Sequence, residues 1–304
     1  MDSSTLSVLT SSINIKEGEY LPAYVSRLLS YSSFLKPQEF YGSFSLGVPR
    51  TSEGYLPLWA LKFADSGVLG KPHLETLDEH LCGSFWRPFA SKDVLDSFVS
   101  KQYERRGTGR VLFKGEKALT KYAPLKYCER CRDEEIEQLG FPVWKSRNQL
   151  PTVFTCEKHK DVLHQKLSNS AAVPDGKSDA AFEQTGGEQL EISMFHRWLE
   201  FESDMIMRTE CRDGNGMLKV YRDVFLESSF FQGANSTAGK RLNSQWLDAL
   251  RRYLFKLFPY QRDELWHQLK SVNIGIRAMM DVSTPVHPLL LLLFKTFYMF
   301  EYKG

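Results

Sequence analysis

Residues 127–163 read YCERCRDEEIEQLGFPVWKSRNQLPTVFTCEKHKDVL, with a short motif near each end. The first motif is Cys128-x-x-Cys131, and the second is Cys156-x-x-His159. Cysteine and histidine side chains in this paired spacing are typical of a tetrahedral zinc site. Because four protein donors fill the coordination shell, the pattern predicts structural Zn²⁺ and not an open catalytic centre. A metal bound only by the folded chain also stabilises a segment that has little core of its own.

Two other interpretations of this stretch stay open at the level of sequence. His164 lies close enough to replace His159 as the fourth ligand, although its distance from Cys156 along the chain is less usual. A zinc enzyme would need three ligands, an open position and a general base. The acids Glu134, Glu135 and Glu137 could supply that base, but solvent-facing positions on a helix explain them better.

The composition is that of an ordinary globular protein, with 304 residues, 42% hydrophobic and 25% charged, and a net charge of only +2. Any nucleic-acid contact must therefore come from local basic patches. Of the five cysteines, Cys82 and Cys211 are isolated, which favours a reducing compartment over a disulfide framework. The N-terminus lacks a signal-peptide pattern, and the apolar stretch 289–300 is too short to span a bilayer. We expect a cytoplasmic protein with no membrane association.

Helical periodicity dominates on both sides of the zinc motifs, so we expect a mainly α fold with a small zinc-ribbon-like module. The apolar residues of 21–31 recur on one face of a helix, and Ser91 is placed to cap another helix. Four segments are predicted: an N-terminal helical, helix-turn-helix-like domain (1–120), a zinc-binding module (121–167), a flexible linker or loop (168–189) and a C-terminal helical, helix-turn-helix-like domain (190–304).

Within these segments, the sequence predicts several local features. A short helix over 133–140 should end at Gly140, and residues 143–144 should form a short strand. Helices are predicted over 217–228 and 244–258, the second with Ser244 as its N-cap. The segment from residue 288 to 300 is apolar almost all round, which indicates burial in a core or against a partner.

Basic residues suggest where DNA would bind. Arginine suits phosphate contacts, and polar side chains at the start of a second helix suit base reading in a helix-turn-helix protein. A solvated loop and a plain helical hairpin explain the same residues without DNA. The candidate DNA-binding residues are Arg105, Arg106, Arg110, Lys145, Arg147, Lys240, Arg241 and Arg251.

The zinc segment as a whole resembles the central signature of the TniQ/TnsD family of transposon target-site selection proteins. That signature has the form Y-C-P-x-C, an acidic helix, G-x-x-x-W, L-P and C-x-x-H-x-x-x-L. Its counterparts here are Tyr127, Cys128, Cys131, Gly140, Trp144, Leu150, Pro151, Cys156, His159 and Leu163. The segments LPAYVSRLLSYSSF (21–34), LWALKFADSGVL (58–69), CGSFWRPFA (82–90) and VHPLLLLLF (286–294) are also similar to family members. One departure is Glu129, where the family usually has proline.

The resemblance implies an adaptor and not an enzyme. Such a protein binds double-stranded target DNA at an attachment site, or docks onto an RNA-guided CRISPR Cascade complex. It then recruits a TnsC-type AAA+ ATPase regulator that activates the transposase. Direct recognition and RNA-guided recruitment both stay open. The rival reading is a zinc-containing, sequence-specific DNA-binding transcription regulator that has no part in transposition.

Overall fold

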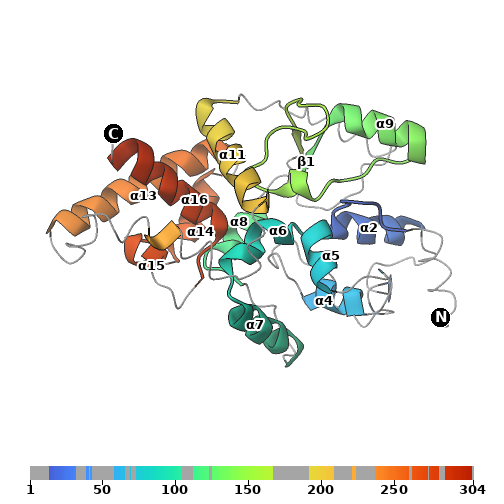
Figure 1. Cartoon of the computed structure of the whole chain (residues 1–304), viewed down its shortest axis with the longest axis horizontal. Coiled ribbons are helices and arrows are strands. Elements are labelled where there is room, and N and C mark those ends of the chain that lie inside the picture. Colours follow the sequence, from blue (N-terminus) through green and yellow to red (C-terminus); the bar gives the residue numbers. More distant parts are fainter. Residues whose placement is uncertain are drawn as a thin grey trace. The chain divides into compact units, whose positions relative to one another are not determined.

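The computed structural model describes residues 14–31, 39–40, 42, 58–65, 69, 73–104, 112–122, 125–166, 192–208, 221–223, 237–259, 262–272, 274–280 and 285–302. Over these residues the chain is mainly helical, which confirms the prediction of a mainly α fold (Figure 1). The predicted linker at 168–189 lies outside the described residues, as do Arg105, Arg106 and Arg110.

The chain divides into two compact units that alternate along the sequence. Unit 1 comprises residues 1–83 and 123–200, and unit 2 comprises residues 84–122 and 201–304. The segment predicted as an N-terminal domain, residues 1–120, therefore contributes to both units. The zinc-motif region, residues 127–163, belongs to unit 1 together with the first helices of the chain.

Unit 1 combines helices with a small antiparallel pair of strands. The strands β1 (Leu125–Tyr127) and β2 (His164–Lys166) pair in the register Leu125 with Lys166 and Tyr127 with His164. The helix α11 (Met194–Arg208) begins in unit 1 and continues into unit 2 from residue 201. The elements are α2 (Leu21–Tyr31), α4 (Leu58–Asp65), α5 (His73–His80), β1 (Leu125–Tyr127), α9 (Glu129–Leu139), the 3-10 helix η2 (Arg147–Gln149), β2 (His164–Lys166) and α11 (Met194–Arg208).

Helix α2 has the predicted bounds and buries the predicted face. Its Tyr24 ring meets Phe63 of α4 edge to face, with centroids 6.3 Å apart. The guanidinium of Arg27 is buried in an ion pair with Glu19, at 2.7 Å, and lies 4.4 Å from the centroid of the Phe141 ring. A buried charge is tolerated only when it is paired and hydrogen-bonded, and this arginine has both kinds of partner.

The segment 142–146 joins the zinc-motif region to the start of the chain. Trp144 packs in a small core with Ala23 and Tyr127, and its carbonyl accepts a hydrogen bond from the Tyr20 amide at 2.7 Å. The Ser146 amide donates to the Gly18 carbonyl at 2.8 Å. The strand predicted at residues 143–144 is wrong, because the described backbone there makes isolated contacts with 18–20 and no continuous ladder.

Unit 2 consists of helices. Residues 84–86 of α6 (Gly83–Trp86) and the C-terminal part of α11, from residue 201, also belong to it. Its elements are α6 (Gly83–Trp86), the 3-10 helix η1 (Arg87–Phe89), α7 (Lys92–Glu104), α8 (Glu116–Tyr122), α13 (Thr237–Leu257), α14 (Arg262–Lys270), α15 (Ile276–Met280), α16 (Pro288–Phe297) and a π-helical turn, η4 (Tyr298–Tyr302).

Helix α16 is buried within unit 2, in agreement with the burial that its apolar sequence predicted. Every residue from Pro288 to Phe297 except Lys295 is buried. Trp246 of α13 packs edge to face on Phe294 with ring centroids 5.0 Å apart, and its indole N–H donates to the Ile274 carbonyl at 3.0 Å. Figure 1 shows α13 and α16 side by side.

The start of α13 differs from the prediction. Ser244 was expected to cap the helix, but α13 begins at Thr237, so Ser244 lies inside it. The segment TAGKRLN contains good helix formers, which extend the helix backwards. Asn243 is also engaged elsewhere, because its side-chain oxygen accepts the Ile276 amide at 3.0 Å. The helix predicted at 217–228 is described only over residues 221–223, which are helical.

Two local signals were predicted correctly. The Ser91 hydroxyl accepts the Val94 amide at 3.3 Å and so caps α7. Helix α9 ends at Gly140, which has φ +78° and whose amide donates to the Ile136 carbonyl at 2.9 Å. Among the described residues, no helix has both the length and the apolar character needed to cross a membrane.

The N-cap of α16 gives a testable pH dependence. His287 is fully buried, its Nδ1 accepts the Leu289 amide at 3.1 Å, and burial lowers its pKa to about 3. The unfolded histidine has a pKa of about 6.5. As pH falls from about 6.5 toward 3, the unfolded chain binds the proton first, so stability falls by up to about 1.4 kcal/mol per pH unit.

We expect His287→Asn, which keeps a capping oxygen and lacks the titrating ring, to flatten this dependence. Urea unfolding followed by circular dichroism at pH 7.5, 6.0 and 5.0 would measure it. The variant should lose less stability than the wild type between pH 7.5 and pH 5.0. Parallel stability curves for the two proteins would show that His287 does not carry the effect.

Candidate metal centre

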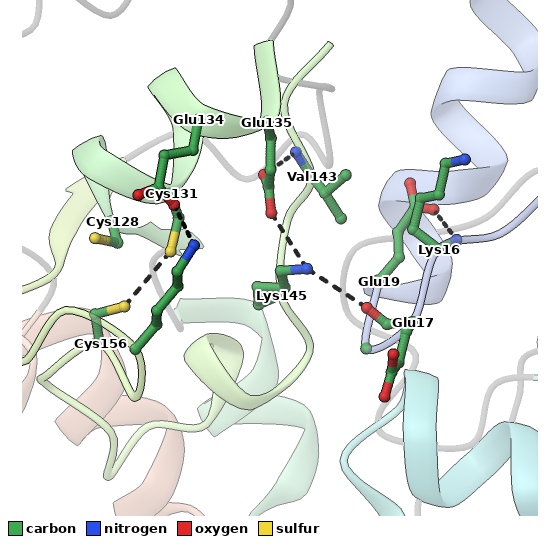
Figure 2. Close-up of polar contacts among 12 residues, drawn as sticks. Lys16, Glu17, Glu19, Cys128, Cys131, Glu134, Glu135, Val143, Lys145 and Cys156 are labelled. Carbon is green, nitrogen blue, oxygen red and sulfur yellow. Dashed lines mark hydrogen bonds and ion pairs between the residues drawn. The ribbon is translucent and has the colours of Figure 1, made fainter. Parts of the chain in front are cut away.

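Four side chains from the two predicted motifs converge on one point in unit 1. They are Cys128, Cys131, Cys156 and His159, and their donor atoms all lie within 4.8 Å of one another. Figure 2 shows the three cysteines grouped at the start of α9 and in the facing loop. This confirms that the predicted residues form a group that can hold a metal ion.

The spacing of the donor atoms fits a tetrahedral ion. The Sγ atoms of Cys131 and Cys156 are 3.5 Å apart, and His159 Nδ1 lies 3.4 Å from Cys128 Sγ and 3.4 Å from Cys131 Sγ. Cys156 Sγ is 3.9 Å from the same nitrogen. Zinc–ligand bonds of about 2.3 Å to sulfur and about 2.0 Å to nitrogen imply tetrahedral edges of about 3.5–3.8 Å. The donor set and its dimensions therefore suit one metal ion with four protein ligands.

Local backbone structure places the first pair of donors. Cys128 is the N-cap residue of α9, and its carbonyl accepts the Arg132 amide at 3.0 Å. Cys131 follows in the first helical turn. Because residues three apart lie on the same side of a helix, the Cys-x-x-Cys spacing brings both sulfurs to one face.

A tight turn places the second pair. The Lys160 amide donates to the Cys156 carbonyl at 2.9 Å, and the Cys156 amide donates to the Asp161 carbonyl at 2.8 Å. Lys160 takes up a positive φ of 61°, which lets the chain reverse. Within this turn, the His159 amide points to Cys156 Sγ at 3.4 Å. The turn thus fixes the sulfur and the imidazole on the same side of the loop.

Burial disfavours the charged form of these thiols when they are alone. It raises the pKa of Cys131 above its usual range, and the neighbouring Cys156 and Cys128 thiols raise it further. The pKa of Cys128 is likewise raised, mainly by burial. A divalent cation supplies the positive charge that such a group of thiolates requires.

Two carboxylates of α9 tie the donor cluster to its surroundings. Glu134 Oε1 lies 3.0 Å from His159 Nε2, and its other oxygen pairs with Lys158. Glu135 points the other way: it accepts the Val143 amide at 2.7 Å and pairs with Lys145 at 3.2 Å (Figure 2). The prediction that these acids are solvent-facing is therefore incomplete, since both have partners.

Sequence reasoning missed two polar groups that contact the second motif and the segment before it, the half-buried Glu200 and the buried Lys126. Glu200 of α11 accepts the amides of Phe154 and Thr155, at 3.2 and 3.0 Å, and the Thr155 hydroxyl at 2.7 Å. Lys126 of β1 donates to the carbonyls of Leu150 and Val153. Burial lowers the pKa of Lys126 to about 7, and Glu200 opposes this shift. Neither residue carries a local sequence signal, because their partners lie far away along the chain.

The alternative ligand His164 does not join the cluster. It lies in β2, with its Nε2 3.6 Å from a Glu129 oxygen and its ring 5.5 Å from the Tyr127 ring. The isolated Cys82 is also separate: its thiol donates to the Ser146 carbonyl at 2.7 Å, and burial raises its pKa to about 12. The four ligands expected from spacing are thus the four that the structure brings together.

The described candidates for DNA binding differ in their surroundings. Lys145 and Arg147 have partners within the zinc-motif region, namely Glu135 for Lys145, and Glu157 at 3.8 Å with the Thr155 carbonyl for Arg147. Lys240, Arg241 and Arg251 are instead exposed on α13. They lie in unit 2, so they belong to a different compact unit from the metal centre.

Comparisons with known proteins add no relative: no family model matches the chain, and no curated protein matches it. The resemblance to the TniQ/TnsD family therefore stays a prediction from the quoted residues.

The cluster predicts a direct dependence of metal content on its cysteines. We expect Cys156→Ala to lose most of the bound metal, from about one ion per chain, and to lower the unfolding temperature, because three donors leave the shell open. Elemental analysis of the purified protein would measure the metal, and circular dichroism the unfolding. Cys82→Ala is the matched control and should keep its metal. Equal metal content in the two variants would contradict the assigned ligand set.

Proposed function

We propose that Cys128, Cys131, Cys156 and His159 bind a structural Zn²⁺ in a zinc-ribbon-like knuckle of a transposon target-site selection adaptor. In this role, the protein binds target DNA and recruits a TnsC-type AAA+ ATPase regulator in the bacterial cytoplasm. It catalyses no reaction of its own. The observation that carries the metal assignment is the set of four donors, whose ligand atoms all lie within 4.8 Å of one another. Zinc would supply cross-linking of the two motifs and no chemistry.

The family assignment rests on what surrounds the ligands in the sequence. Gly140 ends α9 in the left-handed conformation, and Trp144 is buried against Ala23 and Tyr127. Both positions belong to the signature that resembles the TniQ/TnsD family. Their structural roles give a physical reason for these residue types between the two motifs, and this supports the proposal.

Helix α9 is the surface that we assign to the ATPase. None of its residues is buried, and the apolar side chains of Ile136 and Leu139 are 37% and 39% exposed. The metal centre holds one end of this helix, and the Glu135 contacts hold its middle. A fixed helix with exposed apolar side chains is suited to binding another protein.

Helix α13 is the element that we assign to DNA, as the recognition helix of the predicted helix-turn-helix-like unit. Its N-terminal half exposes Lys240, Arg241, Ser244 and Gln245, and Arg251 follows two turns later. Recognition helices present their N-terminal residues to base edges, while arginine and lysine contact phosphates. The opposite side of α13 carries Trp246 in the core of unit 2, which orients the exposed side.

A pair of charge-neutralising changes tests the DNA assignment. We expect Lys240→Gln with Arg241→Gln to weaken DNA binding and to reduce the slope of log affinity against log salt by about one per lost phosphate contact. Gel shifts with DNA alone at several salt concentrations would measure both quantities. The matched control is Lys92→Gln with Lys101→Gln, which removes the same charge from exposed positions of α7.

If both double variants bind as the wild type does, α13 is the wrong surface. A gel shift with the wild type also separates the two modes of targeting. Binding to DNA without any guide complex supports direct attachment-site recognition. Binding only with a Cascade complex present supports RNA-guided recruitment.

Co-sedimentation tests the adaptor role itself. The wild type should sediment with a TnsC-type ATPase assembled on DNA, and Ile136→Ser with Leu139→Ser should reduce the retained fraction several-fold. Met194→Ser, which changes an apolar side chain that is 80% exposed on α11, is the control and should be retained. A wild type that binds DNA but is never retained by the ATPase would favour the transcription-regulator alternative.

A further inference from the structure

Glu134 occupies a position that links the two halves of the metal centre. It lies on α9 one turn after Cys131, so helical periodicity puts its carboxylate on the same face as that ligand. One carboxylate oxygen is 3.0 Å from His159 Nε2, and the other pairs with Lys158 of the opposite loop. Glu134 thus connects the helix that carries the first motif to the turn that carries the second.

The orientation of the His159 ring determines which nitrogen faces the cysteines and which faces Glu134. Its Nδ1 is the nitrogen that faces the three sulfurs, at 3.4 to 3.9 Å. Its Nε2 faces the carboxylate of Glu134. A neutral imidazole carries one proton, so Nδ1 can hold a metal only when the proton is on Nε2. A carboxylate that accepts this proton in a hydrogen bond selects that tautomer and fixes the ring.

The pair between Glu134 and Lys158 does not explain the arrangement by itself. Lys158 is 63% exposed and Glu134 is 37% exposed, and ion pairs at such surfaces contribute little to stability. The His159 side chain, in contrast, is only 5% exposed. The contact that affects the metal centre is therefore the one between Glu134 and His159, and Lys158 keeps the Glu134 carboxylate in place.

We propose that Glu134 is a positioning residue of the metal centre, which holds His159 in the tautomer that binds the metal through Nδ1. Lys158 in turn orients Glu134. The inference rests on the proposed metal site and adds to it a partner beyond the four ligands. It also assigns Nδ1, and not Nε2, as the bound nitrogen. Glu134, one of the acids that an open zinc site would use as a general base, instead supports a closed one.

Zinc affinity tests the proposal in the full chain. Competition with a chromophoric chelator should show Zn²⁺ bound about 10- to 100-fold more weakly by Glu134→Ala than by the wild type. Glu134→Gln should fall between them, because its amide oxygen still accepts the Nε2 proton. Lys158→Met should show a smaller loss in the same direction. Glu137→Ala, which removes the same charge from an exposed position of α9, is the matched control and should bind as the wild type does.

A second measurement reports the tautomer directly. In the zinc-loaded wild type, long-range proton–nitrogen NMR spectra of labelled histidine should show His159 with a protonated Nε2 and a metal-bound Nδ1. The His159→Cys variant, which keeps four donors, identifies the signal by its loss. Circular dichroism with zinc present should give the same helical signal for Glu134→Ala as for Glu137→Ala, so that weaker binding is not a consequence of misfolding.

The outcomes separate this inference from the metal site on which it rests. A wild type that binds no zinc would overturn both. Zinc bound by the wild type, with equal affinities for Glu134→Ala and Glu137→Ala, would overturn only the role of Glu134. A signal from a metal-bound Nε2 would overturn the assigned tautomer. Weaker zinc binding by Glu134→Ala, together with a protonated Nε2 in the wild type, would establish both the role of Glu134 and the assigned tautomer.

Discussion

The convergence of three thiols and one imidazole is the constraint on which the zinc-motif region depends. The strands β1 and β2 are three residues long, and α9 buries none of its residues, so these elements bring little apolar burial of their own. Short strands and an exposed helix are marginal in water. A metal that binds four donors joins the start of the helix to the turn at Cys156, and its binding free energy becomes folding free energy.

The second constraint is the attachment of this region to the first helix. Arg27 and Glu19 form an ion pair in which both side chains are about 2% exposed, and the arginine also stacks on Phe141, next to Pro142 in the segment that follows α9. Removing one partner of a buried pair typically costs about 3–5 kcal/mol, because the other charge is left unpaired. The pair therefore favours one position of residues 141–146 on α2, and Trp144 fills the adjacent core.

Sequence patterns predicted those features of the site that are local. The spacing within each pair, Cys128-x-x-Cys131 and Cys156-x-x-His159, is a local signal, and the two pairs were assigned to one site because a closed zinc shell needs four donors. Gly140 marked the end of α9 by a local signal of the same kind. The contacts of Glu134, Glu200 and Lys126 were missed, since each is made with residues 24 to 46 positions away. The misplaced cap at Ser244 has a different cause: serine suits an N-cap but also occurs inside helices, and α13 begins seven residues earlier, at Thr237.

The positions of the basic side chains bear on where DNA would be bound. Lys145 and Arg147 pair with Glu135 and Glu157, so a phosphate would have to compete with these carboxylates for them. On α13, Lys240, Arg241 and Arg251 are exposed, and Arg251 lies 5.1 Å from the Phe255 ring centroid, a contact that leaves its charge intact. Because the net charge of the chain is only +2, a local surplus of positive charge decides where an anion is attracted. For the proposed adaptor, that surplus of positive charge favours α13 as the surface for the nucleic acid and leaves the acidic α9 as the surface for a protein.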